Sequence, residues 1–333
     1  MRLLPVGLAL LVAVTLVMPA ASSDARRDVL VFVRQDHRAS GLNAGVDIWT
    51  IAATGGHARR LVGGGGWDEE PAWSRDGSRI AFARSIFTPG EPDIGLKSLD
   101  VWTVAADGRG RRKLTRDGSS SPDWSPDGRW LVLGRGDGLV VVRRDGSRKR
   151  LIVRRDDPAA PTWSPHGHLI AFIPPGELRI VGATGRGQRL VARGADSGGS
   201  PSWSPDGSRI AFAGGRTVEG VFVVPWRGVR LRLLARDYVE PAWSPDGRRV
   251  ALVRQGTPGE AGLFLVAVRG GRPHRLTRGL DTQPEWSPDG RRLAFRRGDA
   301  NGDIYVVHAD GGGLRNLTRT PRLDERDPAW RPH

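Results

Sequence analysis

The segment Pro71-Ala-Trp-Ser-Arg-Asp-Gly-Ser-Arg-Ile-Ala-Phe82 returns repeatedly along this chain of 333 residues. Related copies begin at Pro122, Pro161, Pro201, Pro241 and Pro284, and a last, shortened copy begins at Pro328. The tryptophans of the seven copies, at positions 73, 124, 163, 203, 243, 286 and 330, are separated by 51, 39, 40, 40, 43 and 44 residues. A period near 40 residues that carries strand-like runs is typical of a β-propeller.

Each repeat divides into four short strand-like runs, A to D, separated by turn residues. Strand A ends at the tryptophan, and Ser-Pro-Asp-Gly then forms a turn in which proline fixes one φ and glycine supplies a positive φ. Strand B follows, as in residues 209–213, and strand C is a run such as Asp303-Ile-Tyr-Val-Val307. A second glycine-containing turn leads to strand D, as in residues 112–115. Short β-rich runs at this spacing predict four-stranded antiparallel blades.

The two ends of the chain predict how the ring closes. Strand A occurs seven times, and residues 29–62 supply a set of strands B, C and D with no strand A before it. The unpaired strand A near residues 327–331 would complete that blade, which leaves few free sheet edges. We therefore predict an all-β, seven-bladed propeller over residues 24–333, with six or eight blades as the alternatives. The repeated tryptophans are expected to pack between blades.

Residues 1–23 have the pattern of a secretory signal peptide. Arg2 precedes an apolar run from Leu3 to Met18, and small residues follow at positions 20–23. This pattern predicts export and cleavage between residues 20 and 24, with an uncleaved membrane anchor as the alternative. The expected location is the periplasm, the cell envelope or the extracellular space.

Charge and cysteine content narrow the chemistry. The sequence has no cysteine, which excludes disulfides, thiolate metal ligands and a cysteine nucleophile. The net charge is +15, and arginine contributes nearly all of the positive charge. Such a balance favours anionic partners, while a general bias toward arginine is the alternative. Export and the lack of a recognisable nucleic-acid module argue against nucleic acid as a partner.

The repeat Pro-x-Trp-Ser-Pro-Asp-Gly-x-x-Ile-Ala-Phe, followed by Asp-Ile-Trp or Asp-Ile-Tyr, resembles the WD40-like (PD40) repeats of the TolB family. It is also similar to propellers of the dipeptidyl peptidase IV and prolyl oligopeptidase type. The resemblance covers residues 29–333 and implies the propeller fold. TolB has an α/β domain before a six-bladed propeller, whereas the repeats here begin directly after the predicted signal peptide. The peptidases carry a hydrolase domain, for which no residues remain here. These differences argue against the role of TolB itself and against peptidase activity.

Catalytic and metal motifs are sparse. The sequence contains neither a Gly-x-Ser-x-Gly elbow nor a His-Glu-x-x-His pair, and no histidine cluster resembles the metal centres of polysaccharide lyases. Asp299, Asn301 and Asp303 have the alternating spacing of a calcium loop, although Ile304 replaces the glycine expected at the sixth position. An ordinary hairpin turn is the alternative for this segment. We expect no cofactor, with a divalent cation at this segment as the exception.

An acidic cluster precedes the strand-A prolines. The four residues before each of these prolines include ten acidic residues and one base, Arg326, although bases outnumber acids in the whole chain. Nine of the ten acids come from four loops that become consecutive when the ring closes, and these loops share a face with the long B–C loops 35–46 and 85–99. The candidate binding residues, which include two aromatic side chains, are Trp67, Asp68, Glu69, Glu70, Tyr238, Glu240, Asp281, Asp324, Glu325 and Asp327.

We expect this acidic, aromatic mouth to bind a basic peptide segment of a partner protein or a cation. The alternative is that the acids accept hydrogen bonds from backbone amides where loops enter strand A. Arginine-rich turns on the opposite face are a candidate contact for an anionic envelope surface, with solvated turns as the alternative. The expected function is that of an exported, non-catalytic binding or scaffolding module. Two alternatives remain: an enzyme that acts on polysaccharide or peptide in the central channel, and a partner subunit of a separate hydrolase.

Overall fold

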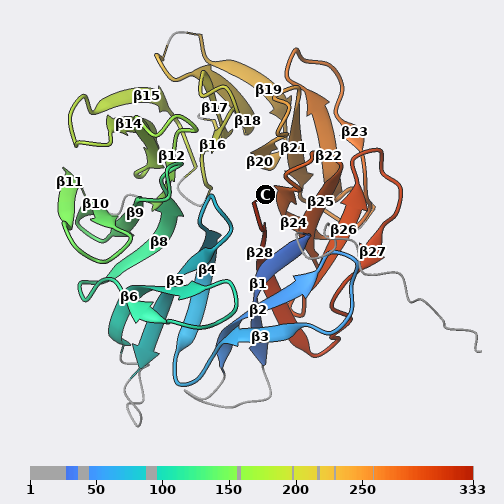
Figure 1. Cartoon of the computed structure of the whole chain (residues 1–333). Helices are drawn as coiled ribbons and strands as arrows, with labels where there is room; N and C mark the ends of the chain where they lie inside the picture. The colour runs from blue at the N-terminus through green and yellow to red at the C-terminus, as the bar shows by residue number, and fades with distance from the viewer. Residues whose placement is uncertain are drawn as a thin grey trace, which may run out of the picture.

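The described strands form a ring of antiparallel sheets, seen along its axis in Figure 1. The computed structural model describes residues 28–36, 45–87, 96–155, 159–196, 199–215, 218–228, 230–257 and 259–332. The predicted signal peptide and most of the two long B–C loops lie outside these residues. No helix is found among the residues described, and hence none long and apolar enough to cross a membrane.

The pairings sort the described strands into seven sets of four, which we number as blades 1 to 7. Blade 1 consists of β4 (Trp67–Trp73), β5 (Arg79–Phe87), β6 (Leu96–Ala105) and β7 (Arg112–Lys113). Blade 2 consists of β8 (Ser119–Trp124), β9 (Trp130–Arg135), β10 (Gly138–Arg143) and β11 (Arg150–Arg154). Blade 3 consists of β12 (Ala159–Trp163), β13 (Leu169–Ile173), β14 (Glu177–Gly182) and β15 (Arg189–Arg193). Blades 4 to 6 are formed by β16 (Ser202–Trp203), β17 (Arg209–Gly214), β18 (Gly220–Pro225) and β19 (Arg232–Arg236); by β20 (Val239–Trp243), β21 (Arg249–Arg254), β22 (Gly262–Ala267) and β23 (His274–Arg275); and by β24 (Asp281–Trp286), β25 (Arg292–Arg297), β26 (Asp303–His308) and β27 (Arg315–Asn316).

Blade 7 joins the two ends of the chain, as the sequence predicts. It consists of β28 (Leu323–Trp330), β1 (Val29–Asp36), β2 (Val46–Ala52) and β3 (Arg59–Val62). The last strand, β28, pairs antiparallel with β1, from Leu30 opposite Trp330 to Asp36 opposite Leu323. A single parallel bridge between Val46 and Trp67 also links blade 7 to blade 1. The closure therefore covers the sheet edge that β1 would otherwise expose.

The repeated tryptophans are buried between blades, as predicted. Trp124, for example, is 5% exposed and packs with Val101 and Leu114 of blade 1 and with Leu131 of its own blade. Its indole nitrogen also donates to the carbonyl oxygen of Ala72 in blade 1, at 3.1 Å. Equivalent bonds to the preceding blade are made by Trp73, Trp203, Trp286 and Trp330. Each of these side chains thus ties two blades together.

The Ser-x-Asp-Gly segment that follows five of the seven repeat tryptophans is a hydrogen-bonded turn. In blade 1, Ser74 Oγ donates to Asp76 Oδ1 at 2.6 Å, and the same carboxylate accepts the backbone N–H of Ser78 at 3.0 Å. Gly77 has a φ of 60°, the conformation that glycine adopts at little cost. These aspartates therefore stabilise the A–B turns, and the turns fix where strand A ends and strand B begins.

Candidate functional site

The innermost strand of every blade is strand A. Neighbouring A strands contact one another in the pairs β28 with β4, β4 with β8, β8 with β12, β16 with β20, β20 with β24 and β24 with β28. Figure 1 shows these strands closest to the centre of the ring. Side chains on strand A therefore determine the chemistry of the central channel and its mouths.

The residue before the strand-A proline has an unusual backbone conformation in six repeats. Its φ is positive, between 45° and 56°, at Glu70, Ser121, Ala160, Glu240, Gln283 and Asp327. The pairing of strand A with strand B shifts register at the same place in these blades, as in a β-bulge. A positive φ is uncommon for a residue other than glycine and is often found where function or packing requires it. The bulge turns these side chains toward the neighbouring blade.

These pre-proline side chains link adjacent blades by hydrogen bonds. The backbone N–H of Ser121 donates to Glu70 Oε2 at 2.6 Å, and the N–H of Gln283 donates to Glu240 in the same way. Gln283 Nε2 also donates to Asp327 Oδ1 at 2.6 Å, while the Asp327 N–H donates to Gln283 Oε1 at 2.9 Å. The alternative role of the acids, as acceptors of hydrogen bonds from backbone amides, is thus observed for Glu70 and Glu240.

This belt of pre-proline residues is acidic on one side and neutral on the other. Blades 5, 7 and 1 contribute Glu240, Asp327 and Glu70, whereas blades 2, 3 and 4 contribute only serine or alanine. Burial raises the pKa of all three acids, and the neighbouring carboxylate of Asp327 raises that of Glu70 further. Glu70 keeps an exposed surface, but protein atoms surround it on most sides.

Three other candidate acids are buried and paired with arginines. Asp281 is 1% exposed, and Arg297 binds both of its oxygens, at 2.5 and 2.8 Å. The other two pairs are Asp68 with Arg84, at 3.3 Å, and Glu325 with Arg34, at 2.6 Å. Burial raises the pKa of Asp68 to about 7 despite the opposing effect of the Arg84 guanidinium. These acids stabilise the mouth and have little surface to offer a ligand.

The last two candidate acids share one arginine. Arg326 lies 2.6 Å from Glu69 and 3.2 Å from Asp324. Asp324 also accepts bonds from Arg296 and from the backbone of Gly302. Burial opposes ionisation of Asp324, but the hydrogen bonds from Arg296 and Gly302 outweigh it and lower the pKa. Charge at the mouth is therefore smaller than a count of acids in the loops indicates.

The two candidate aromatic residues pack against other aromatic rings. The ring centroid of Trp67 lies 4.8 Å from that of Phe87, and the centroid of Tyr238 lies 5.1 Å from that of Phe264, both in edge-to-face geometry. Each ring also packs against an apolar cluster between blades. Trp67 and Tyr238 therefore use part of their ring surface for packing within the protein.

A pocket of about 590 Å³ lies at the same face, where blades 4 and 5 meet. Its lining includes the carboxyl-bearing residues Asp196, Glu219 and Glu240, together with Gln255 and several glycines, and no Lys or Arg among the described residues. Sequence reasoning identified only Glu240 here, because it counted the loops before strand A. Glu219 precedes strand C and Asp196 follows strand D, and both of these ends meet at this face. The acidic side of the mouth thus includes a formed cavity.

Two further acids on the inner strands were missed by sequence reasoning. Asp123 and Glu285 occupy the position between the strand-A proline and the tryptophan, in blades 2 and 6. Asp123 Oδ2 accepts the backbone N–H of Trp163 at 2.7 Å, and burial raises its pKa to about 6. Burial raises the pKa of Glu285 to about 7, and the Asp123 carboxylate raises it further. Because blades 2 and 6 are not neighbours, this interaction crosses the centre of the ring.

Comparison with known proteins agrees with this architecture. Residues 176–333 match the family model described as the TolB beta propeller domain. The second half of the ring is therefore similar to the TolB propeller family. No curated protein shows a significant match to the sequence.

Solved structures extend the likeness over most of the chain. TolB from Acinetobacter baumannii is 17% identical, with a TM-score of 0.57, and the alignment covers 92% of this chain and 83% of that one. An oligogalacturonate lyase in complex with manganese is 16% identical, with a TM-score of 0.62 and coverage of 87% and 84%. A puromycin-hydrolyzing peptidase of Mycobacterium tuberculosis is also 16% identical, with a TM-score of 0.66, and this chain covers 51% of it. At such identities the likeness establishes the propeller fold.

Hydrogen bonds from its own blade occupy Asp303 of the candidate calcium segment. Asp303 Oδ1 accepts bonds from Thr318 at 3.1 Å and from both the backbone N–H and the hydroxyl of Thr320, at 2.8 and 3.0 Å. The other Asp303 oxygen accepts from Asn316. Within the described ranges, no three His, Asp or Glu residues are grouped so that they could hold a metal ion. Calcium binding at Asp299, Asn301 and Asp303 stays a prediction.

The raised pKa of Glu285 predicts that the free energy of unfolding of the protein depends on pH. The folded pKa lies above the ordinary value of 4.5, so stability is lost as the pH rises from about 4.5 to 7 and the loss persists above 7. A shift of this size corresponds to at most about 3 kcal/mol. Glu285 keeps an exposed surface, so solvent screening reduces the expected cost to about 1 kcal/mol. Urea unfolding should therefore show Glu285→Gln to be more stable than the wild type at pH 8 and equal to it at pH 4.

A control distinguishes this effect from a general change in charge. Asp145 lies in an exposed turn, where hydrogen bonds from Ser147 lower its pKa. Asp145→Asn removes the same charge and should give no gain at pH 8. A Glu285→Gln gain of equal size at pH 4 and pH 8 would contradict the assignment to ionisation.

Proposed function

We propose that this TolB-like propeller is an exported, non-catalytic binding module, and that it binds a basic peptide segment of a partner protein at the acidic side of its mouth. The proposal rests chiefly on the pocket between blades 4 and 5. Glu219 and Glu240 are among the residues that line a cavity of about 590 Å³, and the described lining residues include no Lys or Arg. Cavities of this size accommodate small ligands or a few side chains.

Carboxylates in such a pocket favour arginine or lysine side chains. Charge-assisted hydrogen bonds to guanidinium or ammonium groups are shorter and stronger than neutral ones. The belt continues the acidic surface beyond the pocket through Asp327 and Glu70, so an extended segment could contact several acids in succession. The buried pairs, such as Asp281 with Arg297, hold this face in one arrangement and reduce the entropy lost on binding.

Export and location belong to the same proposal. The signal-peptide pattern of residues 1–23 supports export, and we place the protein in the periplasm, at the cell envelope or outside the cell. The arginine-rich turns lie on the opposite face from the pocket, so contact with an anionic surface there would leave the mouth open.

The test is capture of a partner by the mature chain from an envelope extract of the source organism. Wild type is compared with the double variant Glu219→Gln/Glu240→Gln and with a control, Asp107→Asn/Asp145→Asn, which removes two charges from exposed turns on the opposite face. We expect wild type and control to retain a protein whose basic segment cross-links near Glu240. The double variant should bind that protein at least tenfold more weakly, because hydrogen bonds to charged groups contribute about 1.5–3 kcal/mol each.

Stability measurements complete the test. Glutamine at position 240 can still accept the Gln283 N–H, so the thermal midpoint of the double variant should stay within about 2 °C of wild type. Equal capture by all three proteins, or a cross-linked segment without Lys or Arg, would overturn the proposed site.

Catalysis in the channel is the second candidate, and the observation that favours it is the pair Asp123 and Glu285. Carboxyl groups with pKa values of about 6 and 7 suit general acid–base chemistry near neutral pH. Hydrolysis or lyase activity on polysaccharide or peptide substrates, abolished by Glu285→Gln and unaffected by Glu219→Gln, would favour the enzyme over the binding module.

A further inference from the structure

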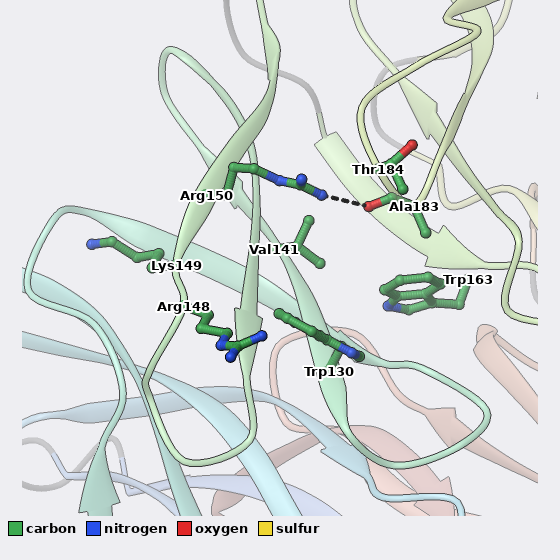
Figure 2. A pocket seen from close by; sticks show the side chains of 8 residues that line it. All are labelled: Trp130, Val141, Arg148, Lys149, Arg150, Trp163, Ala183 and Thr184. Carbon is green, nitrogen blue, oxygen red and sulfur yellow. Dashed lines mark hydrogen bonds between the residues drawn. The ribbon is translucent and has the colours of Figure 1, made fainter.

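A second pocket, of about 570 Å³, lies on the opposite face of the ring between blades 2 and 3. Trp130 and Val141 of blade 2 line it together with Trp163 and Ala183 of blade 3, and Arg148 and Arg150 complete the lining from the C–D turn of blade 2 and from β11. Figure 2 shows the two indole rings side by side in the pocket, with Arg148 beside Trp130. This pocket shares no residue with the acidic mouth.

The repeat pattern explains why a pocket forms at this seam. The first residue of strand B is arginine in four blades: Arg79, Arg209, Arg249 and Arg292. Two of these guanidinium groups lie over the tryptophan of the next blade, Arg249 at 5.1 Å from the Trp286 ring centroid and Arg292 at 5.0 Å from that of Trp330. In blade 2 this position is Trp130, so an indole replaces the guanidinium that would cover Trp163.

The walls of the pocket are mainly apolar. Trp130 and Trp163 pack against one apolar cluster that also contains Val141. Thr184 is the only lining residue with a side-chain hydroxyl among those described. Sugar recognition commonly uses carboxylate and amide side chains to accept bonds from hydroxyl groups, and the described lining contains no Asp, Glu, Asn or Gln. Flat apolar surface is what two indole rings bind best.

Cationic groups surround this apolar wall. Arg150 is held by the Ala183 carbonyl oxygen at 3.2 Å, the bond drawn in Figure 2, and Lys149 points away from the indoles toward Asp117, at 2.9 Å. Arg148 is exposed, and no ion pair holds it among the described residues. Its guanidinium is therefore available to an anionic group of a ligand.

A buried donor adds to this wall. The indole nitrogen of Trp163 is buried and has no hydrogen-bond partner among the described residues, whereas those of five other repeat tryptophans donate to the preceding blade. In Figure 2 this nitrogen lies on the edge of the ring nearer to Trp130. Buried donors are normally satisfied, so a ligand oxygen at this edge would supply the missing acceptor.

We propose that this seam pocket binds a small organic anion with a flat apolar body, such as an aromatic carboxylate. The body lies against Trp130 and Trp163, and the carboxylate pairs with Arg148. Arg150 fixes the outer edge of the pocket by bridging blades 2 and 3. The inference is independent of the basic peptide proposed for the opposite face.

The test is calorimetric titration of the mature chain with 2-naphthoate. Two comparison compounds accompany it: 2-naphthalenemethanol, which lacks the charge, and glucuronate, which has the charge but a surface of hydroxyl groups. We expect saturable one-site binding of 2-naphthoate, at least tenfold weaker binding of the alcohol, and none of glucuronate. Arg148→Ala should weaken 2-naphthoate about tenfold, and Trp130→Arg should abolish its binding.

Two controls keep the result interpretable. Arginine occupies the position of Trp130 in four other blades, so Trp130→Arg is compatible with the repeat, and its thermal midpoint verifies folding. Arg109→Ala removes another exposed positive charge, from a turn of blade 1, and should leave the affinity unchanged. Lack of 2-naphthoate binding, full binding by folded Trp130→Arg, or equal affinity for the uncharged alcohol would overturn the proposal.

Discussion

A chain that ends at Arg322 is expected to lose its cooperative unfolding transition. The truncation removes β28, and with it the antiparallel pairing to β1, the buried Trp330 and the partner of Arg34. Trp330 packs with Leu30 and Phe32 of blade 7, so its loss opens the apolar cluster at the closure. Urea unfolding followed by circular dichroism should show a reduced slope and no stable baseline at 25 °C, since β1 becomes an unprotected edge.

A peptide in trans supplies the control for this truncation. A synthetic segment of residues 320–333 carries the missing strand and should restore part of the transition when added in excess. The matched peptide with Trp330→Ala should restore less. A truncated chain with an unchanged midpoint and slope would show that closure by β28 is not what holds the ring together.

The substitution Arg297→Ala is expected to destabilise the protein by about 3–5 kcal/mol, because it removes the ionic partner of the buried Asp281 carboxylate and leaves it the Thr277 hydroxyl as side-chain donor. Arg297 binds both oxygens of a residue that is 1% exposed, and its guanidinium also lies 4.9 Å from the Tyr305 ring centroid. Chemical unfolding at pH 7 measures the effect. Arg291→Ala, in the A–B turn at the opposite end of the same two strands, is the control and should change stability by less than about 0.5 kcal/mol.

A double variant separates charge from packing. In Arg297→Ala/Asp281→Asn the buried charge is removed together with its partner, so much of the lost stability should return. The coupling between the two sites is then obtained from the double-mutant cycle. A loss below about 1 kcal/mol in the single variant would mean that water or another group satisfies Asp281.

The fold could be predicted from the sequence because the repeat encodes it locally. Pro-x-Trp-Ser-Pro-Asp-Gly specifies the end of strand A, the turn and the interblade tryptophan in one run, and the observed Ser74–Asp76 bond is the expected turn chemistry. Closure followed from a count of strands, since one strand A lacked its blade and one blade lacked strand A. The family match over residues 176–333 agrees with the resemblance of the motif.

The site was harder to predict, because its chemistry depends on partners from other strands. The sequence around Asp281 does not show which arginine pairs with it. In the structure, Arg297 lies directly opposite on β25. The positive φ at Glu240 and the pocket beside it arise from a bulge and from loop ends that a local pattern does not describe. In the sequence, Glu285 has the position of an ordinary strand residue. Only the closed ring brings it across the channel from Asp123.

The indole-to-carbonyl bonds between blades have a consequence for how such chains evolve. Each bond runs in the same direction, from the tryptophan of one repeat to strand A of the repeat before it, and the bond from Trp73 to Ala329 carries this pattern across the junction of the chain ends. A duplicated repeat brings one donor and one acceptor with it, and a deleted repeat removes one of each. Gain or loss of a repeat that makes this bond therefore adds no buried indole without an acceptor to those of Trp163 and Trp243, and the number of blades can change in a single genetic event.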